Sequence, residues 1–125
     1  MSAIKVIVNP YNFNNIKLTD RFVKDILTKF DIDDDIYSLD IYQTAFVHNS
    51  YLKKKPEDIG ENIIIADKPE GAIELMDKDY ERLEFLGDAV ISNIVAKYLF
   101  ERFTDEQEGF LTKMRTKLVN GEMLA

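Results

Sequence analysis

Apolar residues recur at helical spacing in several stretches of the chain, which predicts a mainly all-α fold. The first helix is expected to begin after Thr19, a residue type that suits an N-cap. Its apolar positions share one face: Phe22, Val23, Ile26, Leu27 and Phe30. A second helix is expected where Asp40 and Gln43 resemble a capping box and an apolar stripe continues from Ile41 toward Tyr51.

The longest apolar stretch runs from Leu83 to Phe103. Its apolar residues surround nearly the whole circumference of a helix, which predicts burial on most sides. A further helix should follow, because Thr104 and Gln107 resemble another capping box. The apolar residues of this last helix form one stripe and its cations lie outside it: Phe110, Leu111, Met114 and Leu118 inside, Lys113, Arg115 and Lys117 outside.

The remaining segments carry weaker patterns. Residues 4–8 alternate weakly and are compatible with a short strand or an extended arm, and residues 9–15 are rich in turn-forming Asn and Pro. The acid run 33–35 is interpreted as a solvated turn, since a calcium loop would need a glycine and a twelfth-position ligand. Residues 53–79 are too long for an ordinary connection, and two apolar runs around a Pro and Gly turn predict a small β-hairpin at about 62–76.

Composition narrows the class of protein. The 125 residues suffice for one domain or part of one, and 46% hydrophobic content supports a folded core. The chain has no cysteine, which excludes disulfides and thiolate chemistry. It also has neither a secretion signal nor the run of about 18 apolar residues that a spanning helix needs. We therefore expect a soluble, intracellular protein without membrane contact, in a compartment that the sequence does not specify.

The charge balance bears on possible partners. Sixteen basic and 23 acidic residues give a net charge of −7, which argues against nonspecific adhesion to nucleic acid. A phosphate-rich partner would need charge compensation, and a divalent cation bound by clustered carboxylates could supply it.

One cluster of acids lies within the predicted long helix. At about 100° per residue, Glu81, Glu84 and Asp88 project within about 60° of one another, and Ser92 extends the stripe. Carboxylates one turn apart repel each other, so this pair favours a bound cation. The alternative is that the stripe is only the solvated side of the helix.

The acids belong to a longer motif, Tyr80-Glu-Arg-Leu-Glu-Phe-Leu-Gly-Asp-Ala-Val90. From Glu81 to Ala89 this string resembles the signature of the ribonuclease III family. Two weaker resemblances lie in the expected order, at residues 46–51 and 108–115. The resemblance implies the N-terminal part of a ribonuclease III domain at residues 40–125, preceded by an N-terminal extension with one helix at residues 1–39.

The resemblance also implies a function. Members of this family are homodimeric endonucleases that cut double-stranded RNA, and the residues matching Glu84 and Asp88 bind Mg²⁺, for which Mn²⁺ is able to substitute. Oxygen-only ligands are consistent with these hard metals. Glu81 and Glu108 match a wider acidic patch around the cleavage centre. Phe85 matches an aromatic residue that enters a pocket of the partner subunit, although simple core packing is the alternative.

Other residues receive lesser roles. Gly87 makes the predicted helix less stable than alanine would at the same position. Its presence indicates either that another backbone approaches closely or that the helix simply tolerates a glycine there. His48, the only histidine, matches the upstream family helix and is expected to pack and form hydrogen bonds rather than to act as a base. Lys53, Lys54 and Lys55 are candidate RNA phosphate contacts, although such a run is usually solvated surface.

The chain also departs from the family pattern. A later Asp and Glu that complete the family's metal site are absent, as is the double-stranded-RNA-binding domain that commonly follows. We therefore expect a piece of a longer protein that carries half a metal site and is weak or inactive alone. Two alternatives remain: a catalytically silent relative that binds RNA or acts as a scaffold, and an acidic helical interaction module with no RNA role.

Overall fold

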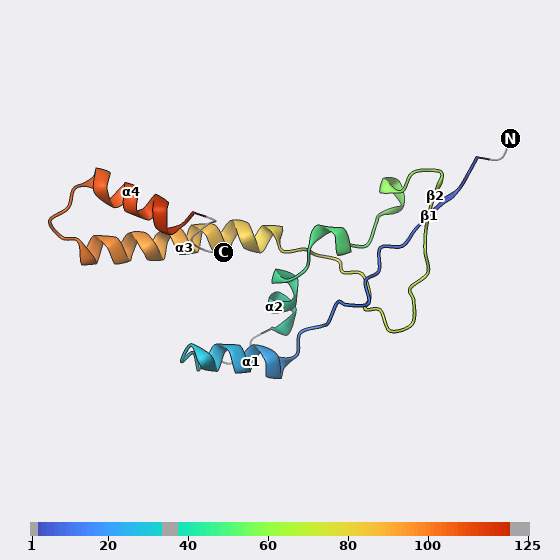
Figure 1. The fold of residues 1–125 in the computed structure, drawn as a ribbon, viewed down its shortest axis with the longest axis horizontal. Coiled ribbons are helices and arrows are strands. Elements are labelled where there is room, and N and C mark those ends of the chain that lie inside the picture. Colours follow the sequence, from blue (N-terminus) through green and yellow to red (C-terminus); the bar gives the residue numbers. More distant parts are fainter. Residues whose placement is uncertain (1–2, 34–37, 121–125) are drawn as a thin grey trace. The chain divides into compact units, whose positions relative to one another are not determined.

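A computed structural model describes residues 3–33 and 38–120 (Figure 1). The chain divides into two compact units, Met1–Glu81 and Arg82–Ala125, and each is described by itself. Helices form most of the regular structure in the described residues, which confirms the predicted fold class. The predicted domain boundary after residue 39 stays a prediction, because compact units report packing and not family membership.

The first unit contains a small parallel sheet. Strand β1 (Val6–Val8) pairs with β2 (Ile63–Ile65), and Val6 lies opposite Ile63. The weakly alternating segment at residues 4–8 therefore contains a strand, but the predicted hairpin at 62–76 is wrong. Its second apolar run instead forms a parallel bridge between Met76 and Leu52. A turn is present, since the Ala72 N–H donates to the Pro69 carbonyl over 3.2 Å, but turn residues do not specify which segment each apolar run pairs with.

Two short helices follow β1. Helix α1 (Asp20–Lys29) begins as predicted, because the Thr19 side chain accepts a hydrogen bond from the Phe22 backbone N–H. Helix α2 (Leu39–Ala45) is shorter than expected, and its predicted capping box is wrong. Ser38 is the N-cap, while Gln43 Oε1 accepts a hydrogen bond from the backbone N–H of Leu18, 2.8 Å away. A tertiary contact thus occupies the side chain that the local motif would have used.

The core of the first unit is formed by residues that follow α2 in the chain. Val47, Tyr51 and Leu75 are buried together, and Tyr51 lies in the short 3-10 helix η1 (Asn49–Tyr51). The Tyr51 hydroxyl donates to the carbonyl of Ile73 over 2.9 Å. A second 3-10 helix, η2 (Pro56–Asp58), follows η1. The long segment after residue 52 therefore has structure and contributes to the core.

Two further segments had sequence-based expectations. The loop at residues 9–15 is confirmed, and the side chains of Asn9 and Asn12 accept hydrogen bonds from the backbone two residues later. Within the acid run, Asp33 is exposed, while Asp34 and Asp35 lie outside the described residues.

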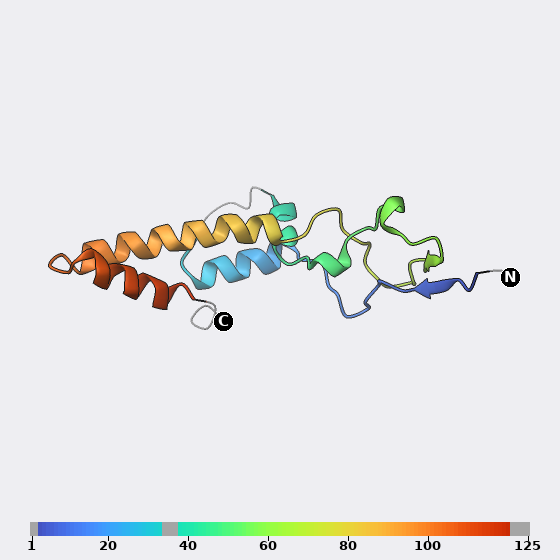
Figure 2. The ribbon, with the colours of Figure 1, turned by 90° about the horizontal axis from the view of Figure 1, so that it is seen from above.

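The second unit is a helical hairpin. Helix α3 spans Glu81–Arg102 and α4 spans Glu108–Leu118, and Figures 1 and 2 both show α4 alongside the later half of α3. Phe103 and Phe110 meet edge to face at the connection, with ring centroids 5.4 Å apart. The predicted capping box is wrong here too, because Gln107 and not Thr104 is the N-cap.

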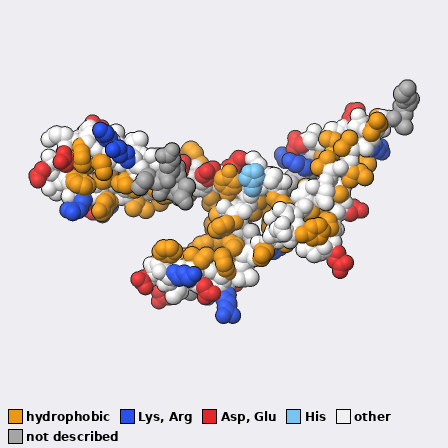
Figure 3. All heavy atoms as spheres, in the orientation of Figure 1, with side chains coloured by type: hydrophobic (Ala, Val, Ile, Leu, Met, Phe, Trp, Pro, Cys, Tyr) orange, Lys and Arg blue, Asp and Glu red, His pale blue; other side chains and the backbone are white. Residues whose placement is uncertain are grey.

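Much of α3 is exposed in the described part of the chain. Leu99 is 2% exposed and is the only buried residue of this helix, whereas Phe85 is 81% and Phe100 72% exposed. The predicted burial on most sides is therefore wrong for these residues, because α4 covers one side of the later half alone. Hydrophobic side chains also lie at the surface in Figure 3. No helix among residues 3–33 and 38–120 combines the length and apolar character required to cross a membrane.

Candidate functional site

The acidic stripe lies at the start of α3. Because α3 is a continuous helix from Glu81, the one-turn spacing of Glu84 and Asp88 places both carboxylates on one side, as predicted. Both residues are exposed. Neither carboxylate has a hydrogen bond or ion pair with another described residue. The stripe therefore presents carboxylate oxygens to solvent without a compensating cation from the described chain.

Glu81 differs from these two acids because it is held at the helix start. Its backbone N–H donates to Asp79 Oδ1 over 3.2 Å, and its Oε1 accepts from Asn49 Nδ2 over 3.3 Å. Asn49 belongs to the segment at residues 46–51 that carried the weaker upstream match. The structure thus joins two of the sequence motifs through a side-chain hydrogen bond at the beginning of α3.

The donor set fits a divalent metal in part. Glu84 and Asp88 offer the hard oxygen ligands that Mg²⁺ and Mn²⁺ prefer. Among the described residues, however, no group of three or more His, Cys, Asp or Glu side chains is placed to hold a metal ion. These two carboxylates would therefore leave most coordination positions to water or to groups outside the described chain.

Glu108 does not join the other acids in the described hairpin. It is the first residue of α4, and its Oε1 accepts a hydrogen bond from Thr112 Oγ1 over 2.7 Å. Helix α4 begins beside the carboxyl end of α3, and Asp88 precedes Arg102 by 14 residues. That separation corresponds to about 21 Å along the helix axis. The role expected for Glu108 stays a prediction.

Two residues of the motif lie beside the acids. Phe85 is 81% exposed, so the alternative of core packing has no support in the described residues. A Cβ added to Gly87 would meet no atom within 4 Å. The close approach inferred from this glycine is therefore not made by any described part of the chain.

The structure assigns His48 a local role. Its Nδ1 accepts a hydrogen bond from the Ser50 backbone N–H over 3.2 Å and lies 2.9 Å from Ser50 Oγ. Its ring stacks on Tyr80, with centroids 6.1 Å apart. These contacts confirm the expectation that His48 packs and forms hydrogen bonds.

The lysine run is exposed but partly paired. Lys53 Nζ lies 2.8 Å from Asp77 Oδ1, and this hydrogen bond, with the charge of the carboxylate, raises the pKa of Lys53. Lys55 Nζ lies 4.0 Å from Glu57 Oε1. Lys54 has no ion-pair partner among the described residues. It is thus the lysine of the run with the most freedom to meet a phosphate.

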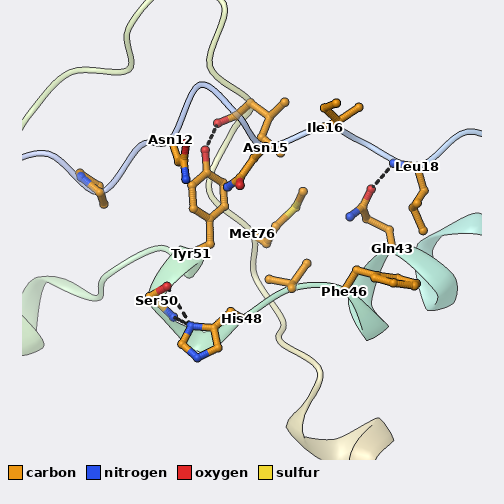
Figure 4. A pocket seen from close by; sticks show the side chains of 13 residues that line it. Asn12, Asn15, Ile16, Leu18, Gln43, Phe46, His48, Ser50, Tyr51 and Met76 are labelled. Atoms are coloured by element: carbon orange, nitrogen blue, oxygen red, sulfur yellow. Dashed lines mark hydrogen bonds between the residues drawn. The ribbon is translucent and has the colours of Figure 1, made fainter. Parts of the chain in front are cut away.

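The sequence did not anticipate a pocket in the first unit, shown in Figure 4. Its volume is about 490 Å³, and its lining combines amide side chains with the apolar side chains of the nearby core. Asn12, Asn15 and Gln43 supply the amides. No local pattern could have revealed it, because its walls come from segments more than 60 residues apart, from Pro10 to Met76. Its lining does not include the acidic stripe.

Comparison with known proteins identifies the family of the chain. The family model of the ribonuclease III domain matches residues 81–125, which include the acidic stripe. A probable ribonuclease 3 of Acanthamoeba polyphaga mimivirus is 36% identical over 118 residues, covering 91% of this chain. The chain belongs to the ribonuclease III family.

Bacterial members of the ribonuclease III family match as well. Ribonuclease 3 of Leuconostoc mesenteroides is 38% identical over 106 residues and covers 85% of this chain. Ribonuclease 3 of Francisella tularensis subsp. novicida is 56% identical over 48 residues, or 38% of the chain. The chain spans 21%, 37% and 21% of the lengths of the viral, Leuconostoc and Francisella proteins, respectively. No solved structure matches the chain.

Proposed function

We propose that this chain is part of the catalytic domain of a metal-dependent endoribonuclease that cuts double-stranded RNA. The observation that carries the proposal is the position of the family motif in the structure. It forms the first turns of α3 and leaves Glu84 and Asp88 exposed, one turn apart and without a partner among the described residues. Two unpaired carboxylates at this spacing slightly destabilise a purely structural helix, since like charges one turn apart repel each other.

In this proposal Glu84 and Asp88 hold a divalent metal, Mg²⁺ or Mn²⁺. A metal bound there supplies Lewis-acid stabilisation of phosphate charge and promotes deprotonation of water. The two carboxylates set the position of that charge on α3. Glu81, held by Asn49, keeps the start of the helix in place beside them.

The proposal accounts for the acidic net charge. A chain with a net charge of −7 repels a polyanion at long range, so its contact with RNA must be local. Cations held by the acidic stripe would provide one such contact. The exposed run Lys53–Lys55 is proposed as a secondary phosphate contact, with Lys54 the least engaged by acids of the described chain.

We also propose that Phe85 packs against a second subunit. Exposure of 81% of a large aromatic side chain in the turn that carries the acids is costly unless another surface covers it. A homodimer arranged through this residue would place two acidic stripes in one assembly.

Cleavage of long duplex RNA by the intact protein that contains this chain tests the proposed activity. Glu84→Gln and Asp88→Asn should each lower the Mg²⁺-dependent cleavage rate by about 100-fold or more, because several kcal/mol of metal stabilisation are lost. Duplex binding should be retained. Glu106→Gln, which changes an exposed acid outside the stripe, is the matched control and should leave the rate unchanged.

Other outcomes would reject parts of the proposal. Duplex binding by the unmodified intact protein without any cleavage would support the silent, RNA-binding or scaffold alternative. The 125-residue chain alone should cut weakly or not at all, because two carboxylates provide an incomplete metal site. Robust cleavage by this chain would show that the ligands have been assigned wrongly.

A further inference from the structure

The β1–β2 ribbon presents an unusual amount of apolar surface for its size. Each strand has three residues, all β-branched, and Val6, Ile7 and Val8 are 53%, 71% and 40% exposed. On β2, Ile63 and Ile64 are 40% and 43% exposed. An isolated two-stranded ribbon is marginally stable in water, so additional strands would stabilise it.

The two edges of this ribbon are not equivalent. The Val6 N–H donates to the Asn62 carbonyl over 2.7 Å, and the Val8 carbonyl accepts from Ala66 over 2.9 Å. Backbone groups of alternate residues point to opposite sides of a strand. The N–H and C=O groups of Ile7 therefore point away from β2, toward the free edge of β1, and an added strand that extends β1 in both directions would bring those of Lys5 and Asn9 to the same edge.

The edge of β2 is better protected. Its outward-facing residues are Ile63 and Ile65, and the Ile63 N–H already donates to the Gly60 carbonyl over 2.9 Å. Acids flank this strand on both sides, at Glu61 and Asp67. Antiparallel pairing of two β2 strands about Ile64 would oppose these acids, and like charges directly across a sheet are unfavourable. The free edge of β1 is thus the one available for strand addition.

We propose that β1 pairs antiparallel with β1 of a second copy of this chain, with Ile7 opposite the partner's Ile7. In this register Lys5 lies opposite the partner's Asn9, so no like charges meet. A register centred on Lys5 would oppose two lysines and is disfavoured. The Ile7 register forms about six backbone hydrogen bonds from the three outward-facing residues of each copy. The product is a four-stranded sheet in the order β2, β1, partner β1, partner β2.

This association is independent of the proposed nuclease function. It uses the first unit, whereas the proposed role of Phe85 concerns α3 in the second. A measurement of mass alone would not separate the two contacts, because either one makes a dimer. The test therefore needs a readout specific to the β1 pair.

The absence of cysteine allows a position-specific cross-linking test on the full 125-residue chain. Directly opposed residues that share hydrogen bonds have Cα atoms about 5.5 Å apart, within the range that a disulfide bridges. Mild oxidation of Ile7→Cys should therefore produce a covalent dimer, measured by nonreducing electrophoresis and intact mass. Ile4→Cys is the matched control, since Ile4 is 87% exposed but would lie about 20 Å from its counterpart in this register.

The cross-linking rate of Ile7→Cys should exceed that of Ile4→Cys by about tenfold or more, in proportion to the local concentration that pairing creates. In a Phe85→Ser background, which removes the other proposed contact, Ile7→Lys should weaken self-association at least about tenfold by sedimentation, because it opposes two lysines. Equal cross-linking of the two cysteine variants, or a monomeric Ile7→Cys chain, would overturn the proposal.

Discussion

Single side chains decide where the helices of this protein begin. Thr19 satisfies a free N–H of the first turn of α1, and Asp79 does the same for Glu81 at the start of α3. Gln43 is the opposite case, because its amide oxygen accepts a hydrogen bond from the Leu18 N–H and does not cap its own helix. A residue type that suits a cap is thus informative only where no tertiary partner competes for it.

Removal of the α1 cap should have a measurable cost. Thr19→Ala leaves the Phe22 N–H without its side-chain acceptor, and we expect the free energy of unfolding to fall by about 1 kcal/mol. Urea denaturation followed by far-UV circular dichroism measures this change. Thr28→Ala, in the last turn of the same helix and away from its N-terminus, is the control and should not destabilise the chain. Equal effects of the two variants would contradict a capping role.

At the scale of elements, α3 is the feature that relates the fold to the proposed chemistry. It carries the family motif in its first turns, and its later half lies alongside α4, with which it lines a shared pocket (Figures 1 and 2). The acids therefore lie on the part of the helix that α4 leaves uncovered. A rigid helix is a suitable support for a metal site, since it fixes the spacing of two ligands one turn apart.

Gly87 allows a prediction about this element. In the chain as described, Gly87→Ala should raise the free energy of unfolding by about 0.5 to 1 kcal/mol, because the new Cβ meets nothing within 4 Å and alanine favours helix. Ala89→Gly, two residues along, should lower it by a similar amount. Chemical denaturation of the 125-residue chain measures both.

Gly87→Ala also tests whether another backbone or subunit approaches Gly87 closely. If Gly87→Ala stabilises the isolated chain but weakens the dimer of the intact protein, another backbone or subunit approaches this position. Stabilisation in both would show that the glycine is merely tolerated. Destabilisation of the isolated chain would contradict the open space found around Gly87.

At the scale of the whole molecule, two compact units share one chain, and both leave large apolar side chains exposed. Their exposed surfaces differ in chemistry. The first unit offers a strand edge with free backbone groups, while the second offers aromatic and aliphatic side chains on a helix. We therefore assign them separate roles in association.

The helix surface leads to a prediction about assembly. In the intact protein, Phe85→Ser should weaken dimerisation by about tenfold or more, because a buried aromatic anchor at an interface commonly contributes 2 kcal/mol or more. Sedimentation equilibrium measures the dissociation constant. Phe100→Ser is the control, since Phe100 lies on the same helix with a similar exposure of 72%. A larger effect of the control would place the interface elsewhere on α3.

The local pattern of the sequence determined the helices, the Thr19 cap and the shared side of Glu84 and Asp88, because helical spacing alone sets which residues lie one turn apart. The family motif also lies in the sequence and needed no coordinates. Only the tertiary structure decided that β2 pairs with β1, that the Gln43 side chain accepts a hydrogen bond from the Leu18 N–H, and that α4 leaves Phe85 exposed. These outcomes depend on contacts between residues far apart in the chain, whose partners no local periodicity specifies.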